Sequence, residues 1–315
     1  MTAPVVTPVA RYHIVDTFPE FLRFWEEAQG HSPGALADLW RDRYMAQWPE
    51  LLAKQQEDYR QQGFDWRVVA GARIFPRLAE RLPAMRDARE GLLACVGSVY
   101  QTARARLGLD FDVVFVLYMG VVGAGWATTY AGRRACLFGL ETLAECGWTS
   151  AGALAPFTAH ELGHLVHQER RARASLAEGD SPLWQLYEEG FAQYCEHLAM
   201  GRQTWHEADQ QPGWVEWCRS SRGWLAAEFL STVAQGRPVR AFFGSWYTIR
   251  GRRQCGYFLG HELVRQWVGA QGLSAVAVLP ADEVEQRGRD WLLGEAVGGC
   301  RTRPAGTRPN HCGAT

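Results

Sequence analysis

The sequence lacks the signals that mark membrane, secreted or nucleic-acid-binding proteins. No run approaches the ~18 consecutive apolar residues of a membrane-spanning helix, and the N-terminus has no charged start followed by an apolar block. The formal net charge is −1, and no sustained basic face is present, which argues against nucleic-acid binding. We therefore expect a cytoplasmic protein with no membrane and no nucleic-acid partner; the oligomeric state stays open.

The chain also lacks paired cysteines. Its eight cysteines are scattered, and no two of them form a Cys-x-x-Cys motif. This usage indicates reduced thiols in a cytosolic protein rather than a disulfide framework or a cysteine zinc site. With 315 residues and 47% hydrophobic content, the chain can bury a large core, and it shows no internal repeat or long linker. These features are consistent with a globular enzyme.

The most informative segment that is present reads His-Glu-Leu-Gly-His, at residues 160–164. On a helix, His160 and His164 lie one turn apart on the same face, so both imidazoles can bind one Zn²⁺ while Glu161 lies beside it. Zinc needs nitrogen ligands and an open position for water, and a carboxylate is needed to take the proton of that water during attack on a carbonyl. The pattern predicts a hydrolytic zinc site, although five residues can also match it by chance.

The residues around the motif favour a buried helix. Thr149 or Ser150 can act as its N-cap, and the basic run 170–173 suits its C-terminal end. Pro156 offers an alternative start near Ala155, because proline is tolerated in the first turn of a helix but is costly inside it. Either start leaves the two histidines on one face.

A third zinc ligand is expected from the segment Tyr-Glu-Glu-Gly-Phe-Ala-Gln-Tyr at residues 187–194. Together with the first motif, its Glu-Gly-Phe-Ala sequence resembles the gluzincin metallopeptidases, in which a second helix supplies a glutamate ligand. The resemblance implies that Glu189 joins the two histidines at the metal. The 24 residues between His164 and Glu189 are closer to a family of predicted zinc-dependent proteases of unknown function, and the resemblance covers roughly residues 110–270.

Three neighbouring residues compete for roles at the metal. Glu188 is an alternative to Glu189, but the two point about 100° apart on a helix, so only one can face the metal. His167 lies on the same stripe as His160 but about 10 Å along the axis, and the sequence lacks the further Gly and His of the metzincin pattern. Gln193 lies one turn after Glu189, where related sites carry a carboxylate that orients a ligand.

The group that stabilises the tetrahedral intermediate is expected on a later helix. Tyr257-Phe-Leu-Gly260 matches a Tyr-x-x-Gly helix of the predicted protease family, and His261 follows one turn after the tyrosine. Tyr257 is our first choice for the donor, and His261 can assist or replace it. Gly256 and Gly260 would allow this helix to approach the metal helices closely. A structural role for both polar side chains is the alternative.

These motifs fit an α+β, zincin-like fold with a small antiparallel sheet, an active-site helix and mostly helical surroundings. We expect an N-terminal helical region (1–108), a metallopeptidase domain (109–299) and a disordered tail (300–315). Short β-rich runs are found at 113–118, 126–130 and 135–138, and helices are predicted at 84–107, 214–234 and 256–268. The segment 136–141 is a candidate edge strand for extended peptide, or a purely structural strand.

The sequence thus predicts a zinc metallopeptidase that hydrolyses a peptide or protein substrate. Zn²⁺ held by His160, His164 and Glu189 would polarise the scissile carbonyl and activate water, with Glu161 as general base. Two alternatives stay open: a non-catalytic zinc-stabilised binding or regulatory protein, and a zinc hydrolase of a non-peptide substrate. The intact Glu161 favours catalysis, since a structural site needs no base.

Overall fold

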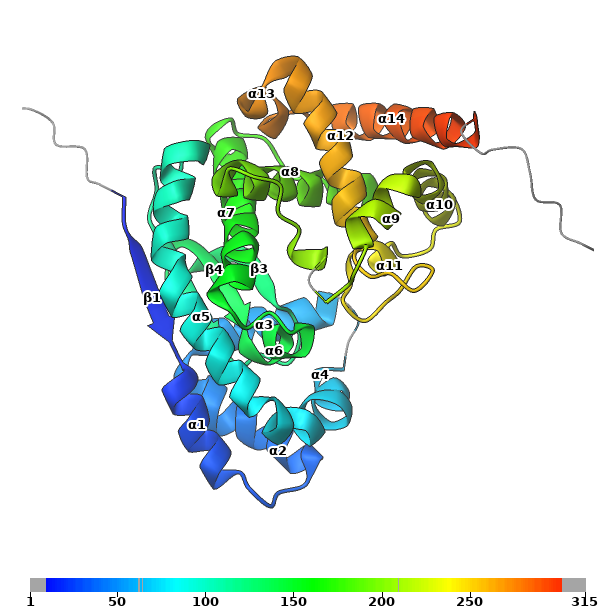
Figure 1. The fold of residues 1–315 in the computed structure, drawn as a ribbon. Helices are drawn as coiled ribbons and strands as arrows, with labels where there is room; N and C mark the ends of the chain where they lie inside the picture. The colour runs from blue at the N-terminus through cyan, green and yellow to red at the C-terminus, as the bar shows by residue number, and fades with distance from the viewer. Residues whose placement is uncertain (1–9, 62, 64, 209, 302–315) are drawn as a thin grey trace, which may run out of the picture.

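The structure is a computed structural model that describes residues 10–61, 63, 65–208 and 210–301. A four-stranded sheet packs against a much larger set of helices (Figure 1). The strands are β1 (Tyr12–Asp16), β2 (Val113–Tyr118), β3 (Gly125–Tyr130) and β4 (Arg133–Gly139). The predicted α+β class is confirmed. The predicted tail lies outside the described residues, apart from positions 300 and 301.

The sheet is mixed, which corrects the prediction of an antiparallel one. Its order is β1-β2-β4-β3; β2 pairs in parallel with β1 and with β4, and only β3 and β4 are antiparallel. β2 is buried at every residue, as its uninterrupted apolar sequence requires for a central parallel strand. The sequence does not predict β1, because this strand is short and half-exposed and its partner lies far along the chain.

The edge of the sheet beside the zinc-motif helix is β3. β4 is paired on both sides, with β2 and with β3, so of the two predictions for segment 136–141 the free edge is wrong and the purely structural strand is right. The neighbouring predicted run at 126–130 corresponds to β3 and takes the edge position instead. The apolar sequence of β4 reflects its burial between two strands. Periodicity alone does not distinguish such a central strand from an edge strand.

The N-terminal region is helical, as predicted, but it also contributes β1 to the sheet, and the buried core is continuous across residue 108. Thr17 precedes the first helix without capping it; its hydroxyl instead donates to the Leu117 carbonyl (2.9 Å). The predicted helix 84–107 is the second half of a longer one that accommodates Pro83. The helices are α1 (Phe18–Glu27), α2 (Pro33–Leu39), η1 (Trp40–Tyr44), η2 (Met45–Gln47), α3 (Pro49–Gln61), α4 (Trp66–Val69), η3 (Ala70–Ile74) and α5 (Phe75–Leu107).

The two motif helices cross in the middle of the molecule. Ser150 caps the zinc-motif helix by accepting a hydrogen bond from the Ala153 N–H, so the earlier of the two predicted starts is right and Pro156 lies inside the helix. Gly190 and Gly260 allow backbone contact between the glutamate helix and a later one, because a Cβ at either position would overlap the other helix. These helices are α6 (Leu140–Cys146), α7 (Ala151–Arg173), α8 (Pro182–Met200) and α12 (Cys255–Gln271).

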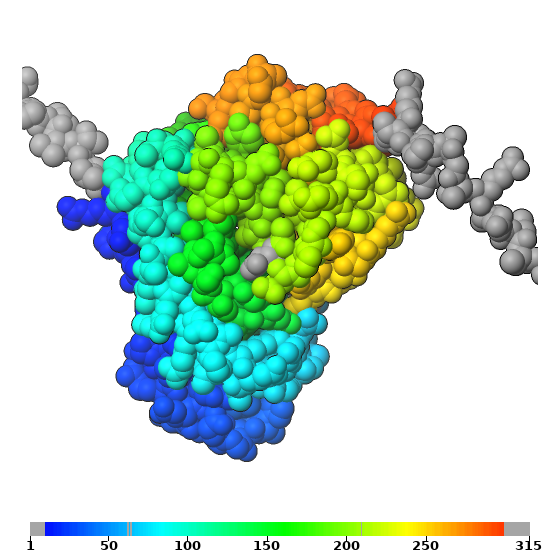
Figure 2. All heavy atoms as spheres, in the orientation of Figure 1, coloured from blue at the N-terminus to red at the C-terminus, as the bar shows by residue number. Residues whose placement is uncertain are grey.

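Of the remaining helices, the last two lie at the end of the molecule opposite the N-terminal helices, whereas the helices between residues 206 and 243 lie beside α7 and α12 (Figures 1 and 2). The predicted helix 214–234 is broken at Ser221 into two. Among the described residues, no helix is both long enough and apolar enough to cross a membrane. The elements are η4 (His206–Ala208), α9 (Trp214–Ser220), α10 (Arg222–Ala234), α11 (Arg240–Phe243), α13 (Leu273–Ala277) and α14 (Ala281–Arg301).

Candidate metal centre

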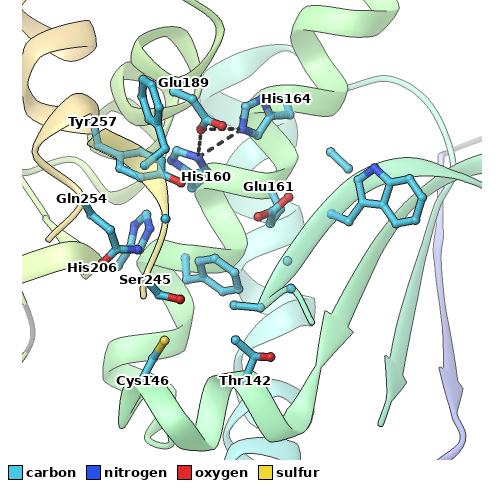
Figure 3. A pocket seen from close by; sticks show the side chains of 18 of the residues that line it. Thr142, Cys146, His160, Glu161, His164, Glu189, His206, Ser245, Gln254 and Tyr257 are labelled. Atoms are coloured by element: carbon cyan, nitrogen blue, oxygen red, sulfur yellow. Dashed lines mark hydrogen bonds and ion pairs between the residues drawn. The ribbon is translucent and has the colours of Figure 1, made fainter. Parts of the chain in front are cut away.

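Three side chains from α7 and α8 converge on one point (Figure 3). His160 Nε2 lies 3.1 Å from His164 Nε2 and 3.2 Å from Glu189 Oε2, and the third side of this triangle, from His164 Nε2 to Glu189 Oε2, measures 3.3 Å. Zinc bonds of about 2.0–2.1 Å at tetrahedral angles separate ligand atoms by about 3.3 Å. The spacing and the donor set of two nitrogens and one carboxylate oxygen therefore fit a zinc ion.

The electrostatics of the triangle favour a positive charge within it. Burial alone would lower the pKa of His164, but the Glu189 carboxylate raises it to about 9. Burial likewise opposes ionisation of Glu189, yet the charge of His164 and hydrogen bonds from both histidines hold its pKa far below the usual range. Burial lowers the pKa of His160 to about 4, which keeps it neutral, as a metal ligand must be. A metal ion bound between the three ligand atoms would supply the positive charge that a proton on His164 otherwise supplies to Glu189.

The structure brings Glu189, and not Glu188, to the two imidazoles. The closest approach of the Glu188 carboxylate is 3.9 Å, to His164 Nδ1, on the side away from the triangle. His167 is fully buried one turn further along α7, where its Nε2 lies 2.9 Å from the Tyr187 hydroxyl. His167 therefore packs between helices and lies outside the ligand cluster, as the distance along the helix predicts.

Glu161 faces the cavity next to the triangle, pressed against β3. Its side chain is 6% exposed, and burial raises its pKa to about 7. The Ala127 backbone hydrogen-bonds to its carboxylate. Gly125 is required at this contact, because a Cβ there would overlap Glu161 Oε1. The sequence offers no signal for this role of Gly125, since the contact joins a strand and a helix.

The side chain behind His160 is Glu196, and not Gln193, which occupies the position where related sites carry an orienting carboxylate. Glu196 Oε2 lies 3.9 Å from His160 Nδ1 and is completely buried. The Gln193 amide instead donates to the Thr204 carbonyl (3.0 Å), away from the triangle. Both residues follow Glu189 on α8, and the packing of the loop after α8 decides which one turns towards α7.

His206 is a cavity residue that sequence reasoning missed. It lies in η4, is 4% exposed, and places Nδ1 2.7 Å from Glu196 Oε2 and Nε2 3.4 Å from Glu207 Oε1. Burial disfavours its charge, but Glu207 and Glu196 raise its pKa to about 9. Its segment, Trp-His-Glu-Ala, has no periodicity or motif that would have identified it.

Of the two predicted donors on α12, Tyr257 lies at the cavity and His261 does not. Tyr257 lines the cavity, with its ring 5.5 Å from the His160 ring and 5.9 Å from the His206 ring, measured between centroids. Burial raises the pKa of its hydroxyl well above the usual value, so it stays protonated. His261 is buried between His197 (4.4 Å) and Trp205 (5.0 Å) and does not line the cavity. The structure therefore does not bring His261 to the site, because α8 and the loop after it cover that part of α12.

The cavity has a volume of about 760 Å³ and opens onto the triangle. One wall is the backbone of residues 122–127, which runs into β3, and the opposite wall is the segment 243–247 with Arg240 and Gln254. Sites for small ligands are typically roughly 300–1,000 Å³ in volume. The space suits a few residues of a peptide or a molecule of similar size.

The loop at residues 119–122, which leads from β2 to the cavity wall, is held by buried side chains, most of them from the N-terminal helices. The bonds run from Met119 N–H to the Tyr44 hydroxyl (2.9 Å), Gly120 N–H to Glu141 (3.0 Å), Val121 N–H to the Tyr59 hydroxyl (3.1 Å) and the Gln55 amide to the Val122 carbonyl (3.4 Å). The Tyr118 hydroxyl also donates to Gln55 (2.5 Å). We name Tyr44, Gln55, Tyr59, Tyr118 and Glu141 the loop network.

Comparisons with known proteins return no match. No family model, no curated protein and no solved structure matches this chain. The resemblance to gluzincins thus rests on the motifs themselves, and the chemistry of the site is argued from its geometry.

Proposed function

We propose that the protein is a zinc-dependent peptidase with a zincin-like arrangement of its active-site helices. His160, His164 and Glu189 would hold one zinc ion, and Glu161 would act as general base. The observation that carries the proposal is the triangle of three ligand atoms, 3.1–3.3 Å apart, with a buried carboxylate beside it at the wall of a cavity. A purely structural zinc site would usually close its fourth position with a protein ligand, whereas this triangle faces open space.

Glu161 is suited to proton transfer at neutral pH. When bound, zinc would polarise the substrate carbonyl and lower the pKa of water to about 7. The pKa of Glu161 is also about 7, so the carboxylate can accept the proton of the attacking water and then deliver it to the departing amine. Contact with Gly125 and a hydrogen bond from the Ala127 backbone hold the carboxylate in place.

Tyr257 and His206 are the donors available to the developing oxyanion. Both line the cavity beside His160, and both carry a proton at neutral pH. His206 is already oriented by Glu196, whereas the Tyr257 hydroxyl makes no hydrogen bond to any described residue. We assign the main role to Tyr257 and a supporting role to His206, which takes the place predicted for His261.

The edge of β3 is partly covered by α7, and the part that lines the cavity, at Gly125, favours a peptide as the substrate. Ala124 accepts a hydrogen bond from Gly139 in β4, so residues 124, 126 and 128 pair with that strand and the odd residues face away from it. Side chains of α7 already bind both backbone groups of Ala127, through Glu161 and Gln168. Gly125 is left with its backbone towards the cavity, where an extended peptide can pair with it.

The test is digestion of an unbiased peptide library by the wild type and by Glu161→Gln, with cleavage products read by mass spectrometry. Glu161→Gln removes the base but no ligand, so it should keep zinc while turnover falls by about 10²–10⁴-fold. Glu188→Gln is the matched control, a neighbouring cavity carboxylate that should keep most activity. Equal cleavage by the wild type and Glu161→Gln, or none by either, would overturn the proposal in favour of a binding protein or a non-peptide hydrolase.

A further inference from the structure

The cavity extends beyond the triangle into a recess between α6 and the segment after α11. In Figure 3, Thr142 and Cys146 on α6 and Ser245 opposite them point into this space, on the far side of Glu161 from the zinc ligands. We name the recess the α6 pocket; its walls are Thr142, Cys146, Trp148, Phe157, Phe243 and Ser245.

We infer that the α6 pocket is a subsite for one large apolar or aromatic side chain of the substrate, next to the bond that is cleaved. The inference rests on the proposed function, because it names the substrate class of the same site. The position of Phe157 supports it: this residue precedes Glu161 by one turn on α7, and its ring contacts the same Gly125 that contacts the Glu161 carboxylate. A side chain in the pocket would therefore belong to a residue at the reacting carbonyl or its immediate neighbour.

The six side chains that form the walls of the α6 pocket are neutral, and the charged ring that packs against them is His206, 5.1 Å from Trp148 and 5.2 Å from Phe157 between centroids. Aromatic rings form part of the surface, with Trp148 5.1 Å from Phe157 between centroids. Burial raises the pKa of the Cys146 thiol to about 12, so it is uncharged. Neither carboxylate of α6 lines the pocket: Glu141 binds the Gly120 N–H (3.0 Å), and Glu145 binds Arg81 (3.1 Å).

The polar groups of the pocket are already paired. Thr142 donates its hydroxyl to Glu141 (3.2 Å), and Ser245 hydrogen-bonds to the Cys146 thiol. A cationic group of the substrate would lose water there without gaining a partner, and it would meet the charge of His206, which is unfavourable. An apolar side chain gains from burial and gives up nothing.

The other end of the cavity has the opposite character. Beyond His164 it is lined by Glu178, Gln185 and Glu188, which present carboxylates and an amide. An apolar group gains nothing from these neighbours. Of the two ends of the cavity, only the α6 pocket therefore suits an apolar side chain. The apolar side chain of the substrate would lie on the α6 side of the metal.

Ser245 allows a test that leaves the catalytic residues untouched. Ser245→Leu should fill the pocket, and Ser245→Asp should place a carboxylate in it. Thr248→Leu and Thr248→Asp are matched controls, because Thr248 lies on the same segment, is exposed and does not line the cavity. Zinc content and thermal stability of all four variants should match the wild type.

In a peptide-library digest, the wild type should select Phe, Tyr, Leu or Met at one position beside the cleaved bond. Replacing that residue by Ala should lower kcat/KM by about 10–100-fold. Ser245→Leu should shift the selection to small residues and Ser245→Asp to Lys or Arg, while both Thr248 variants keep the wild-type selection. Cleavage without any preference at either neighbouring position, or an unchanged preference in both Ser245 variants, overturns the inference while the peptidase proposal stands.

A binding measurement separates the two proposals. Two hydroxamates that differ only in a benzyl or a methyl side chain are titrated calorimetrically into the zinc-loaded protein. The benzyl compound should bind about 10–100-fold more tightly, and the difference should vanish in Ser245→Asp but persist in Thr248→Asp. This result upholds the subsite even if no peptide is cleaved, in which case only the proposed reaction fails. Equal affinities, including no binding of either compound, overturn the subsite.

Discussion

Two buried polar networks meet at β3, and they differ in how completely their atoms are paired. In the loop network, no buried nitrogen or oxygen of the five side chains lacks a hydrogen-bond partner. In the metal network, His160 Nδ1, one oxygen of Glu196 and both oxygens of Glu207 have no hydrogen-bond partner among the described residues, although Glu207 forms an ion pair with His206 (3.4 Å). We use this second name for His160, Glu161, His164, Glu189, Glu196, His206 and Glu207.

The difference separates a scaffold from a binding site. Buried polar groups in native proteins are nearly always paired, and each one left unpaired costs about 1–3 kcal/mol. A group of unpaired atoms beside a cavity therefore marks a place that an ion, water or substrate completes. The loop network is complete in itself, and it fixes the backbone from which β3 carries Gly125 to Glu161.

The largest effect should come from removing a zinc ligand. His164→Ala and Glu189→Ala each delete one corner of the triangle, so zinc content should fall from about one ion per chain to near zero, and activity with it. Glu188→Ala, which removes a carboxylate outside the triangle, should keep the metal. Metal analysis of the purified variants measures both. If Glu188→Ala loses zinc and Glu189→Ala keeps it, the neighbouring glutamate is the ligand.

The next effect belongs to the oxyanion donor. Tyr257→Phe removes only a hydroxyl at the cavity, so kcat should fall by about 10²–10³-fold, with KM and zinc content little changed. His261→Ala serves as the control from the same helix, since its side chain lies outside the cavity, and steady-state kinetics should show a much smaller loss of kcat. Near-normal turnover in Tyr257→Phe together with a large loss in His206→Gln would transfer the role to His206.

A smaller effect concerns the loop network and is seen in the pH dependence of the free energy of unfolding. Burial raises the pKa of Glu141 to about 7 in the folded protein, above its unfolded value of 4.5, so the folded state favours the protonated carboxyl. The contribution of Glu141 to the free energy of unfolding should therefore fall as the pH rises from about 4.5 to about 7, by up to about 3 kcal/mol. In Glu141→Gln this contribution should disappear, while the contribution of Glu161, whose pKa is also raised to about 7, should remain. Urea titrations of both proteins across this pH range measure it, and parallel curves would contradict the assignment.

The smallest effect should follow loss of one hydroxyl from the loop network. Tyr59→Phe leaves the Val121 N–H without its acceptor, so stability should fall by about 1–3 kcal/mol, while zinc content stays that of the wild type. Thermal or chemical unfolding together with metal analysis checks both statements. Loss of zinc in Tyr59→Phe would show that the two networks are not independent.

The sequence predicts the residues of the site better than the sheet beside them. The positions of His160, Glu161 and His164 follow from helical periodicity, which is a local property of α7. The Glu-Gly-Phe-Ala segment at residues 189–192 predicts that Glu189, and not Glu188, faces the two histidines from the second helix. The prediction of an antiparallel sheet is wrong because strand order and direction depend on pairing between segments far apart in the chain, as with β1 and β2.

Sequence alone therefore predicted which three side chains meet at the triangle, the carboxylate beside them and the helical character of most of the chain. These predictions depend on spacing within a helix and, for Glu189, on a motif in a second helix. Only the tertiary structure decided that β3 forms the edge, that Gly125 contacts Glu161, that Glu196 and His206 lie behind the triangle, and that His261 turns away from it. Each of these depends on how separate elements pack, and packing distances between elements leave no periodic trace in the sequence.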